Sequence, residues 1–287
     1  MAIAKTPQDL KITPRDRRFG RDEKQERWWF AGDPFSTAFL NALSVTFPRG
    51  EAFFIDSVKA FRDGASPKLE REIRAFTMQE VMHSREHVAF NRKIADTGYN
   101  LAPLEAAVEE AMQRIKDRPA IVNLAVTMAL EHYTALMARI MMRNPGWWQG
   151  VEKHWADLWR WHSIEEIEHK GVAYDTWLHA TRDWSRWQRW KMKARVMMLI
   201  TVFFWSNRIK GMLELLRQDG ITGARARWGV FRQLFVTPGI LRKALPGWIA
   251  YFMPGFHPWN HDDRELIALV DSEYEAAKLP PGLVAAE

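Results

Sequence analysis

Two Glu-x-x-His pairs, each preceded by a single glutamate on a separate segment, are the part of this chain best suited to do chemistry. Residues three apart on a helix share one face, so each pair presents a carboxylate and an imidazole in the same direction. Two such helices, together with two helices that each contribute one inward glutamate, supply the ligands of a carboxylate-bridged two-metal site in a four-helix bundle. The six residues are Glu51, Glu80, His83, Glu131, Glu166 and His169.

The number of inward carboxylates favours metal binding over a polar core without metal. An ionised carboxylate inside a helical core costs much free energy unless it is paired or binds a metal ion. Salt bridges alone can hardly accommodate four such glutamates on four predicted helices. His162 stands four residues before Glu166 and shares its face, so we expect a third imidazole ligand there. The alternative is a core histidine that bonds a backbone carbonyl.

Other titratable residues lie close to these positions along the chain. His87 follows His83 by one turn on the same face, and we interpret it as a further ligand, a hydrogen-bond partner of a ligand or a proton relay. Glu165 and Glu168 flank the second pair, but their helical phase predicts that they face solvent or contact the ligands from outside. The same interpretation applies to Glu86, His132 and His154.

The donor atoms indicate which metals fit. Carboxylate oxygens are hard donors that favour iron or manganese, whereas imidazole tolerates several metals. The chain has no cysteine, which excludes thiolate zinc sites, iron–sulfur clusters and disulfides. We therefore expect two iron ions, with manganese or a mixed iron–manganese pair as alternatives. Such a centre can activate oxygen in its reduced form, and a two-metal site can also polarise water for hydrolysis.

Five stretches before residue 182 have the hydrophobic periodicity and the end signals of helices. Pro48 interrupts the first stretch, because proline breaks a helix interior but suits a first turn. The third stretch is shorter and can provide the long crossover of a ferritin-like bundle. No strand-like alternation occurs, so we expect an all-α fold. The predicted helices cover residues 34–64, 67–97, 101–117, 119–142 and 150–181.

The chain divides into three parts by composition. Residues 1–32 are polar and charged, and we expect a loosely ordered extension in which the aromatic run at 28–30 docks onto the body. Residues 33–181 are expected to form a ferritin-like four-helix bundle that carries the two-metal site. Residues 182–287 are expected to form a basic, Trp-rich helical extension, with a last amphipathic helix over 263–277.

Positive charge is concentrated at the start of that extension. Residues 182–243 include 14 Lys or Arg and three acidic residues. Trp favours the membrane–water boundary, and Lys and Arg attract anionic lipid, so one hypothesis is peripheral membrane contact through residues 184–212. Alternatively, this segment packs across the bundle or against a second copy in a homodimer. Nucleic-acid binding is a weaker alternative, because no recognised motif accompanies the charge.

The sequence also bears on where the protein resides. The first twenty residues lack the apolar core of a signal peptide. The longest uncharged apolar run, residues 196–207, is shorter than the roughly 20 apolar residues that span a bilayer. We expect a cytoplasmic protein, with membrane association as the alternative.

At its candidate ligands the chain resembles the ferritin-like di-iron oxygenases. The pattern is similar to that of the arylamine N-oxygenase branch, which acts on p-aminobenzoate-type amines and adds a third histidine at the place of His162. The resemblance implies a di-iron cofactor and oxygen activation, but no particular substrate. The ligands that it implies are Glu51, Glu80, His83, Glu131, His162, Glu166 and His169.

Taken as a whole, the chain is similar to a bacterial family described as predicted metal-dependent hydrolases. The stretches Ala-Leu-Ser at 42–44 and Phe-Pro-Arg-Gly-Glu at 47–51 are typical of that family, as are the two Glu-x-x-His helices. The resemblance covers most of residues 33–181 and, more loosely, the C-terminal part. Known helical hydrolases place a His-Asp doublet on a bundle helix, whereas the only such doublet here, His261-Asp262, lies in a Pro-rich region.

These observations lead to one expected function and two alternatives. We expect a di-iron enzyme that activates oxygen to hydroxylate, desaturate or N-oxygenate an apolar small molecule or lipid. It needs an external electron donor, because the chain has no reductase or flavin motif. The first alternative is a metal-dependent hydrolase that uses a hydroxide held by two metal ions. The second is non-catalytic, ferritin-like iron handling, against which the long aromatic extension argues.

Overall fold

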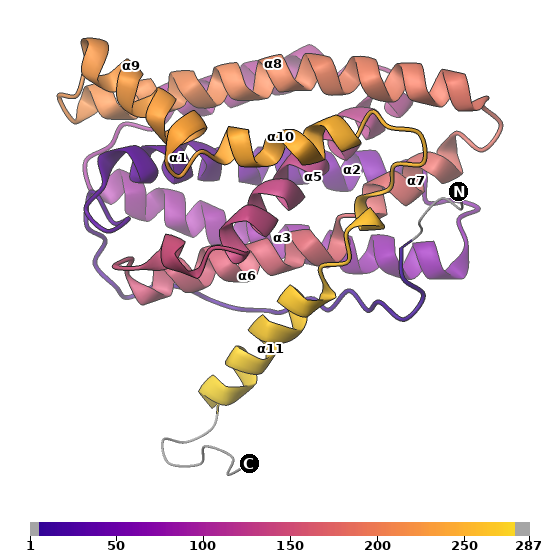
Figure 1. The fold of residues 1–287 in the computed structure, drawn as a ribbon, viewed down its shortest axis with the longest axis horizontal. Coiled ribbons are helices and arrows are strands. Elements are labelled where there is room, and N and C mark those ends of the chain that lie inside the picture. The colour runs from indigo at the N-terminus through magenta and orange to yellow at the C-terminus, as the bar shows by residue number, and fades with distance from the viewer. Residues whose placement is uncertain (1–5, 279–287) are drawn as a thin grey trace.

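Helices make up most of the chain in the computed structural model, which describes residues 6–278 (Figure 1). Within these residues there is no strand, so the all-α prediction is confirmed. The first part contains α1 (Pro34–Ser44), α2 (Phe47–Lys59), α3 (Pro67–Asp96), α4 (Ala102–Ile115), α5 (Ala120–Met142), α6 (Lys153–His169) and α7 (Val172–Ala180). The second part contains α8 (Arg186–Gln218), α9 (Gly223–Phe231), the π-helical turn η2 (Arg232–Val236), α10 (Ile240–Ala250) and α11 (Arg264–Lys278).

Four helices, α2, α3, α5 and α6, surround the candidate ligands. Helix α2 packs on α3 and α5, and α6 packs on α5 and α3, so the four close into a bundle. The sequence signals for their ends hold. Pro48 lies in the first turn of α2, the Ser66 side chain accepts from the Leu69 amide at the start of α3, and Gly98 follows α3 at φ +92°. These residues fix where the two helices begin and end.

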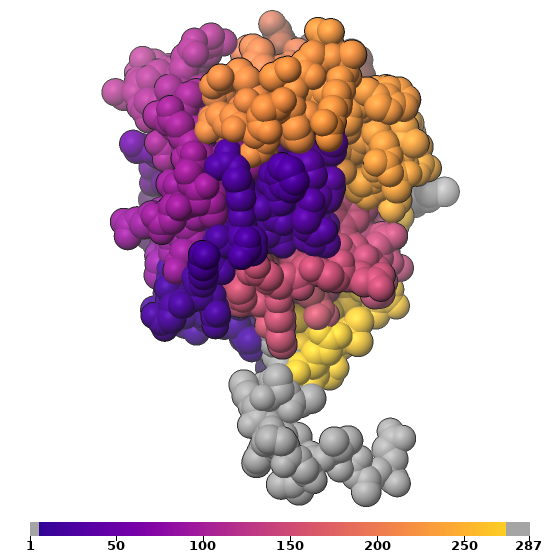
Figure 2. All heavy atoms as spheres, turned by 90° about the vertical axis from the view of Figure 1, so that its left-hand side faces the viewer, coloured from indigo at the N-terminus to yellow at the C-terminus, as the bar shows by residue number. Residues whose placement is uncertain are grey.

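Helices outside the bundle cover it on more than one side, since α8 and α10 pack on α5 whereas α11 packs on α6. The predicted crossover is α4, which connects α3 to α5 and contacts α2 and α8. The long helix α8 lies across α1 and α5, and α10 also packs on α5 (Figure 1). Seen from one end of the bundle, the segment with α9 and α10 (orange) lies above the N-terminal part and α1 (indigo) (Figure 2). The ferritin-like assignment and the three-part division of the chain stay predictions.

The helix predicted over 150–181 is wrong in one respect, because it is broken into α6 and α7 at Lys170 and Gly171. A Cβ on Gly171 would lie 2.5 Å from Thr6 Oγ1 and 3.0 Å from two atoms of Trp259. The break therefore lies where Thr6 and Trp259 pack closely against the bundle. No proline marks this position, so the periodicity gave no reason to end the helix there.

Residues 6–32, which we call the N-terminal strap, also differ from expectation. We predicted a loosely ordered extension, but the strap packs along the bundle (Figure 1). Phe19, Trp29 and Phe30 are buried, and Trp29 Nε1 donates to Asn41 Oδ1 at 2.8 Å. Trp28 is 39% exposed, and its Nε1 donates to Asp219 Oδ2 at 3.1 Å. The burial of Trp29 and Phe30 confirms the predicted docking of the aromatic run. The packing of the rest of the strap was missed, because a segment that is neither helix nor strand has no hydrophobic periodicity.

Two helices are long and apolar enough to cross a membrane by length and composition. In α5, 72% of the apolar window is buried, as expected for a core helix, whereas in α8 only 33% is buried. The uncharged run at 196–207 is too short to span a bilayer, but α8 as a whole is not. Four of its exposed apolar residues, Met198, Leu199, Val202 and Phe203, lie within that run.

Candidate metal centre

The seven predicted ligands converge inside the bundle. Helix α2 contributes one, α3 two, α5 one and α6 three, and none of the seven side chains is more than 3% exposed. They form three groups whose donor atoms lie within 4.8 Å of one another. The groups are Glu51 with His83 and His162, Glu80 with Glu131 and His169, and Glu80 with His83 and Glu166.

His169 is the meeting point of three helices. Its Nε2 lies 3.3 Å from Glu80 Oε1, 3.3 Å from Glu131 Oε2 and 3.4 Å from Glu166 Oε2. Around the other half of the cluster, the rings of His83 and His162 stack at 4.1 Å, and His162 Nε2 lies 2.8 Å from Glu166 Oε1. Because the groups share members, the seven residues form one continuous cluster.

Many donor atoms of this cluster have no hydrogen-bond partner. Buried polar atoms in folded proteins are nearly always hydrogen-bonded, since leaving them unpaired costs the full desolvation free energy. Buried carboxylate oxygens and ring nitrogens that point toward one another without hydrogen-bond partners are therefore suited to bind a cation. The eight atoms are Glu51 Oε1, both carboxylate oxygens of Glu80 and of Glu131, His83 Nδ1, Glu166 Oε2 and His169 Nε2.

The proton affinities of these carboxyls reflect first their burial and then the charges of their neighbours. Burial, followed by the neighbouring carboxylates, raises the pKa of Glu51 and of Glu131 well above the usual range. Burial also raises the pKa of Glu80. Burial opposes ionisation of Glu166, but His169 and His162 outweigh it and hold the pKa of Glu166 well below the usual range. Without a cation the cluster thus stores protons on carboxyls that a metal ion would ionise.

Two of the histidine ligands are held in one orientation from behind. His83 Nε2 bonds Glu165 Oε2 at 3.1 Å, which leaves Nδ1 facing the cluster. His169 Nδ1 bonds Gln79 Oε1 at 3.0 Å, which leaves Nε2 facing the cluster. Hydrogen bonds of this kind fix the ring and its tautomer behind a metal ligand. Sequence reasoning missed Gln79, although its place directly before Glu80 was a signal.

Arg15 of the N-terminal strap supports both of these contacts. Its Nη2 donates to Glu168 Oε1 at 2.6 Å, and its backbone amide donates to Glu165 Oε1 at 2.9 Å. Glu168 in turn accepts from Gln79 Nε2 at 2.8 Å. Both glutamates are fully buried, so their predicted solvent-facing position is wrong. Glu165 contacts the ligand His83 from outside, as the alternative predicted, whereas Glu168 contacts Gln79 and not a ligand. No sequence signal connects Arg15 to a helix about 150 residues away.

The remaining titratable candidates lie around the cluster. His87 belongs to none of the three groups: its Nε2 bonds His162 Nδ1 at 2.7 Å and its Nδ1 bonds Ser44 Oγ at 2.8 Å. Burial lowers the pKa of His87 well below the usual range and that of His162 to about 4. His87 thus occupies the position of a hydrogen-bond partner or relay.

Glu86, His132 and His154 lie outside the ligand cluster and contact other parts of the fold. Glu86 is buried, which corrects its predicted solvent-facing position, and accepts from the Phe19 amide and Arg21 of the strap. His132 is also buried, with Nε2 bonded to the Gly247 carbonyl at 3.0 Å. His154 stays partly exposed beside Glu152.

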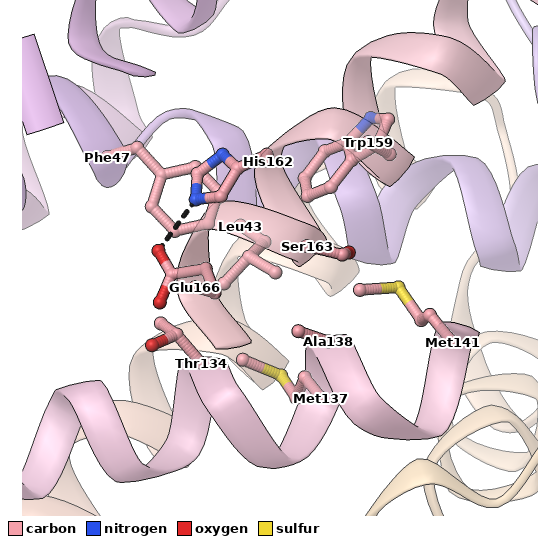
Figure 3. Close-up of a pocket in the computed structure, with 10 residues that line it drawn as sticks. All are labelled: Leu43, Phe47, Thr134, Met137, Ala138, Met141, Trp159, His162, Ser163 and Glu166. Carbon is pink, nitrogen blue, oxygen red and sulfur yellow. Dashed lines mark hydrogen bonds and ion pairs between the residues drawn. The ribbon is translucent and has the colours of Figure 1, made fainter. Parts of the chain in front are cut away.

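A small cavity borders the cluster (Figure 3). Its volume is about 20 Å³, which suits one water molecule or little more. His162 and Glu166 line one end, with Phe47 and Trp159 on the same side and Met137 of α5 opposite them (Figure 3). A larger surface depression of about 550 Å³, lined by residues 26–32 and 150–152, includes no candidate ligand.

The fold and the site define an all-helical protein with a buried carboxylate and imidazole cluster that fits metal ions. The chain belongs to a protein family described as "predicted metal-dependent hydrolase", whose family model matches residues 13–262. This range takes in the strap from Thr13 onward, the whole bundle and most of the C-terminal part. No curated protein and no solved structure matches the chain.

Proposed function

We propose that this protein is a metal-dependent hydrolase with a two-metal centre in the bundle. Its family description supports hydrolysis, and the observation that carries the proposal is the set of eight unpartnered donor atoms on four helices. The ligands we assign to the two ions are Glu51, Glu80, His83, Glu131, His162, Glu166 and His169. Four carboxylates would offset the charge of two divalent cations, which the buried site requires.

The side chains of the protein would hold the metal ions, orient the ligands and exclude bulk water from the site. A pair of divalent cations, when bound, supplies a Lewis acid and lowers the pKa of an attached water molecule. Glu165 and Gln79 fix His83 and His169 so that each presents one ring nitrogen to the ions. The rings of Phe47, Trp161 and Phe76 pack against the histidines of the cluster and exclude bulk water.

Proton movement has a ready route. Ser44 Oγ, His87 and His162 form a hydrogen-bonded chain from α1 through α3 to α6. His87 can hold a proton at Nδ1 or Nε2 and pass it along the chain to or from His162. No side chain outside the ligand set is required as a nucleophile.

A second function is favoured by one observation, the small apolar cavity beside His162 and Glu166. An ester or phosphoester needs room and polar contacts, whereas dioxygen fits a cavity of about 20 Å³. The expected oxygen-activating di-iron enzyme, acting on an apolar molecule with electrons from an external donor, therefore remains the competing proposal. The doublet His261-Asp262 is exposed and outside the cluster, so it adds nothing to hydrolysis.

One experiment separates the two functions. Protein stripped of metal is reloaded with zinc, manganese or ferrous iron under nitrogen and tested on p-nitrophenyl esters and phosphoesters. Anaerobic turnover that Glu131→Gln abolishes supports hydrolysis. Rapid oxygen consumption by the ferrous protein alone, with no anaerobic turnover of any ester, overturns hydrolysis and supports oxygen activation.

A further inference from the structure

A broad apolar surface on α8, α9, η2 and α10 is open to solvent. We call it the basic apolar face. Val202 on α8 and Trp228 on α9 are each more than 60% exposed, and both are surrounded by similar residues. The other exposed apolar residues of the face are Met198, Leu199, Phe203, Phe231, Phe235, Val236, Leu245, Ile249 and Met253. Exposed apolar surface on this scale marks an interaction site in a soluble protein.

The face is continuous across its helices. Helix α8 packs on α9, and η2 packs on both α9 and α10. Trp248 Nε1 of α10 donates to Thr201 Oγ1 of α8 at 3.0 Å, so these two helices lie side by side (Figure 1). Trp228, Phe231 and Phe235 stack in succession, with ring centroids 5.5 and 5.2 Å apart.

Cations without acidic partners accompany the face. Among the described residues, none of these cations forms an ion pair with a carboxylate. The neighbouring helix α4 carries three acids, of which Glu109 and Glu110 pair with Arg49 and Arg114. The cations are Arg186, Lys191, Arg195, Arg225, Arg227, Arg232, Arg242 and Lys243.

We propose that the basic apolar face docks the protein on an anionic lipid bilayer, with the apolar residues entering the headgroup region and the cations contacting lipid phosphates and carboxylates. Trp at a boundary and Lys or Arg around it are the composition of interfacial membrane contacts. A second copy of the chain is the less suitable partner. A two-fold interface would place this face against itself and bring the same cations together. The inference does not depend on the metal chemistry.

Flotation of the full chain with vesicles tests the proposal. We expect binding to phosphatidylcholine vesicles that contain phosphatidylserine, little binding to pure phosphatidylcholine, and loss of binding when salt is raised from about 0.1 to about 1 M. The double variant Arg225→Gln and Arg227→Gln should bind on the order of tenfold more weakly, because each basic residue near the surface contributes attraction to anionic lipid.

A matched pair of variants tests the apolar contribution. Val202→Asp with Trp228→Asp should abolish vesicle binding. Met78→Asp with Leu269→Asp, on α3 and α11, adds the same charge at residues that are similarly exposed and should leave binding unchanged. Circular dichroism checks that both variants stay helical. Equal vesicle binding by both double variants would overturn the proposal. So would a dimer in light scattering that only the first variant dissociates, without any vesicle binding by the parent.

Discussion

At the scale of single residues, the central feature is a conflict of charge among the inward glutamates. Glu51, Glu80 and Glu131 have raised pKa values because they are buried beside one another, while histidines hold the pKa of Glu166 low. Without a cation, Glu51 and Glu131 therefore favour their protonated forms and Glu166 favours its ionised form. Metal binding must displace these protons, and the cluster therefore couples metal affinity to pH.

Metal affinity should rise with pH. Glu51 and Glu131, whose pKa values are raised, must each release a proton to become ligands. His83 must do the same, because Glu165 and Glu80 raise its pKa by more than burial lowers it. Titration with zinc between about pH 6 and about pH 8 should give a dissociation constant that falls steadily as pH rises. Glu166, with its lowered pKa, titrates below this range. A dissociation constant that does not change with pH would contradict the assigned protonation.

Arg15 should matter for metal affinity although it is no ligand. Arg15→Met removes the contacts that hold Glu168 and, through it, Gln79 behind His169. Loss of such support behind a metal ligand weakens binding roughly 10- to 100-fold. The control is Arg18→Met in the same strap, because Arg18 forms an exposed pair with Asp16 and should leave affinity unchanged.

Competition with a chelating dye measures the affinity of both strap variants on folded protein. Arg15→Lys should recover part of the affinity, since a cation returns to Glu168 without the bidentate geometry. Unchanged affinity in Arg15→Met would mean that the strap covers the site without orienting its ligands.

At the scale of elements, the sequence predicted those helix ends that local residues determine. Pro48, Pro67 and Gly98 mark ends of α2 and α3 that local chemistry fixes, and the predicted ends fall close to the observed ones. The inward faces followed from the three- and four-residue spacing within each helix, and so did the convergence of the seven predicted ligands. The break at Gly171 and the path of the strap depend on contacts between distant segments, which no local pattern encodes.

Gly171→Ala should destabilise the protein by about 1–3 kcal/mol, because the added methyl group overlaps Thr6 and Trp259 in a closely packed contact. Gly50→Ala is the matched control in helix α2, where an added Cβ meets nothing within 4 Å. That change should be neutral or stabilise by roughly 0.5–1 kcal/mol, as expected for Ala in a helix. Urea unfolding measures both free energies, and equal values would show that the side chains around Gly171 yield easily to the added methyl group.

At the scale of the whole molecule, the ligands could be predicted from sequence but their support could not. The Glu-x-x-His spacing identifies inward residues because a helix repeats about every 3.6 residues. Glu165 and Glu168 are turned away from the ligand face, as their phase predicted, yet they are buried because the strap lies over them. Helical phase predicts the direction in which a side chain points, whereas its burial depends on which other segments pack over it.

Removal of metal should lower the melting temperature, and more so at higher pH. Without a cation, Glu51 and Glu131 stay neutral in the folded state, whereas in the unfolded chain they ionise above the ordinary glutamate pKa of 4.5. The apo protein therefore loses stability as pH rises from that value toward the raised pKa values. The raised pKa of His83 acts in the same direction.

Calorimetry with and without a chelator measures this effect. At metal concentrations about 1,000 times the dissociation constant, binding adds about 4 kcal/mol to the stability of the folded state. The drop on chelation should be several degrees and larger at about pH 8 than at about pH 6. An equal drop at both values would show that the buried carboxyls are already ionised in the apo protein.

The most direct test of the account is the amount of metal that the folded chain binds. After reconstitution and removal of loose metal, elemental analysis should find about two ions per chain. Glu131→Gln, which removes a buried carboxylate next to His169, should hold at most one while keeping its helix content. Two ions in the wild-type protein, reduced in the variant, would establish the cluster as the metal centre. Less than one ion per chain, or full retention by the variant, would contradict the central claim.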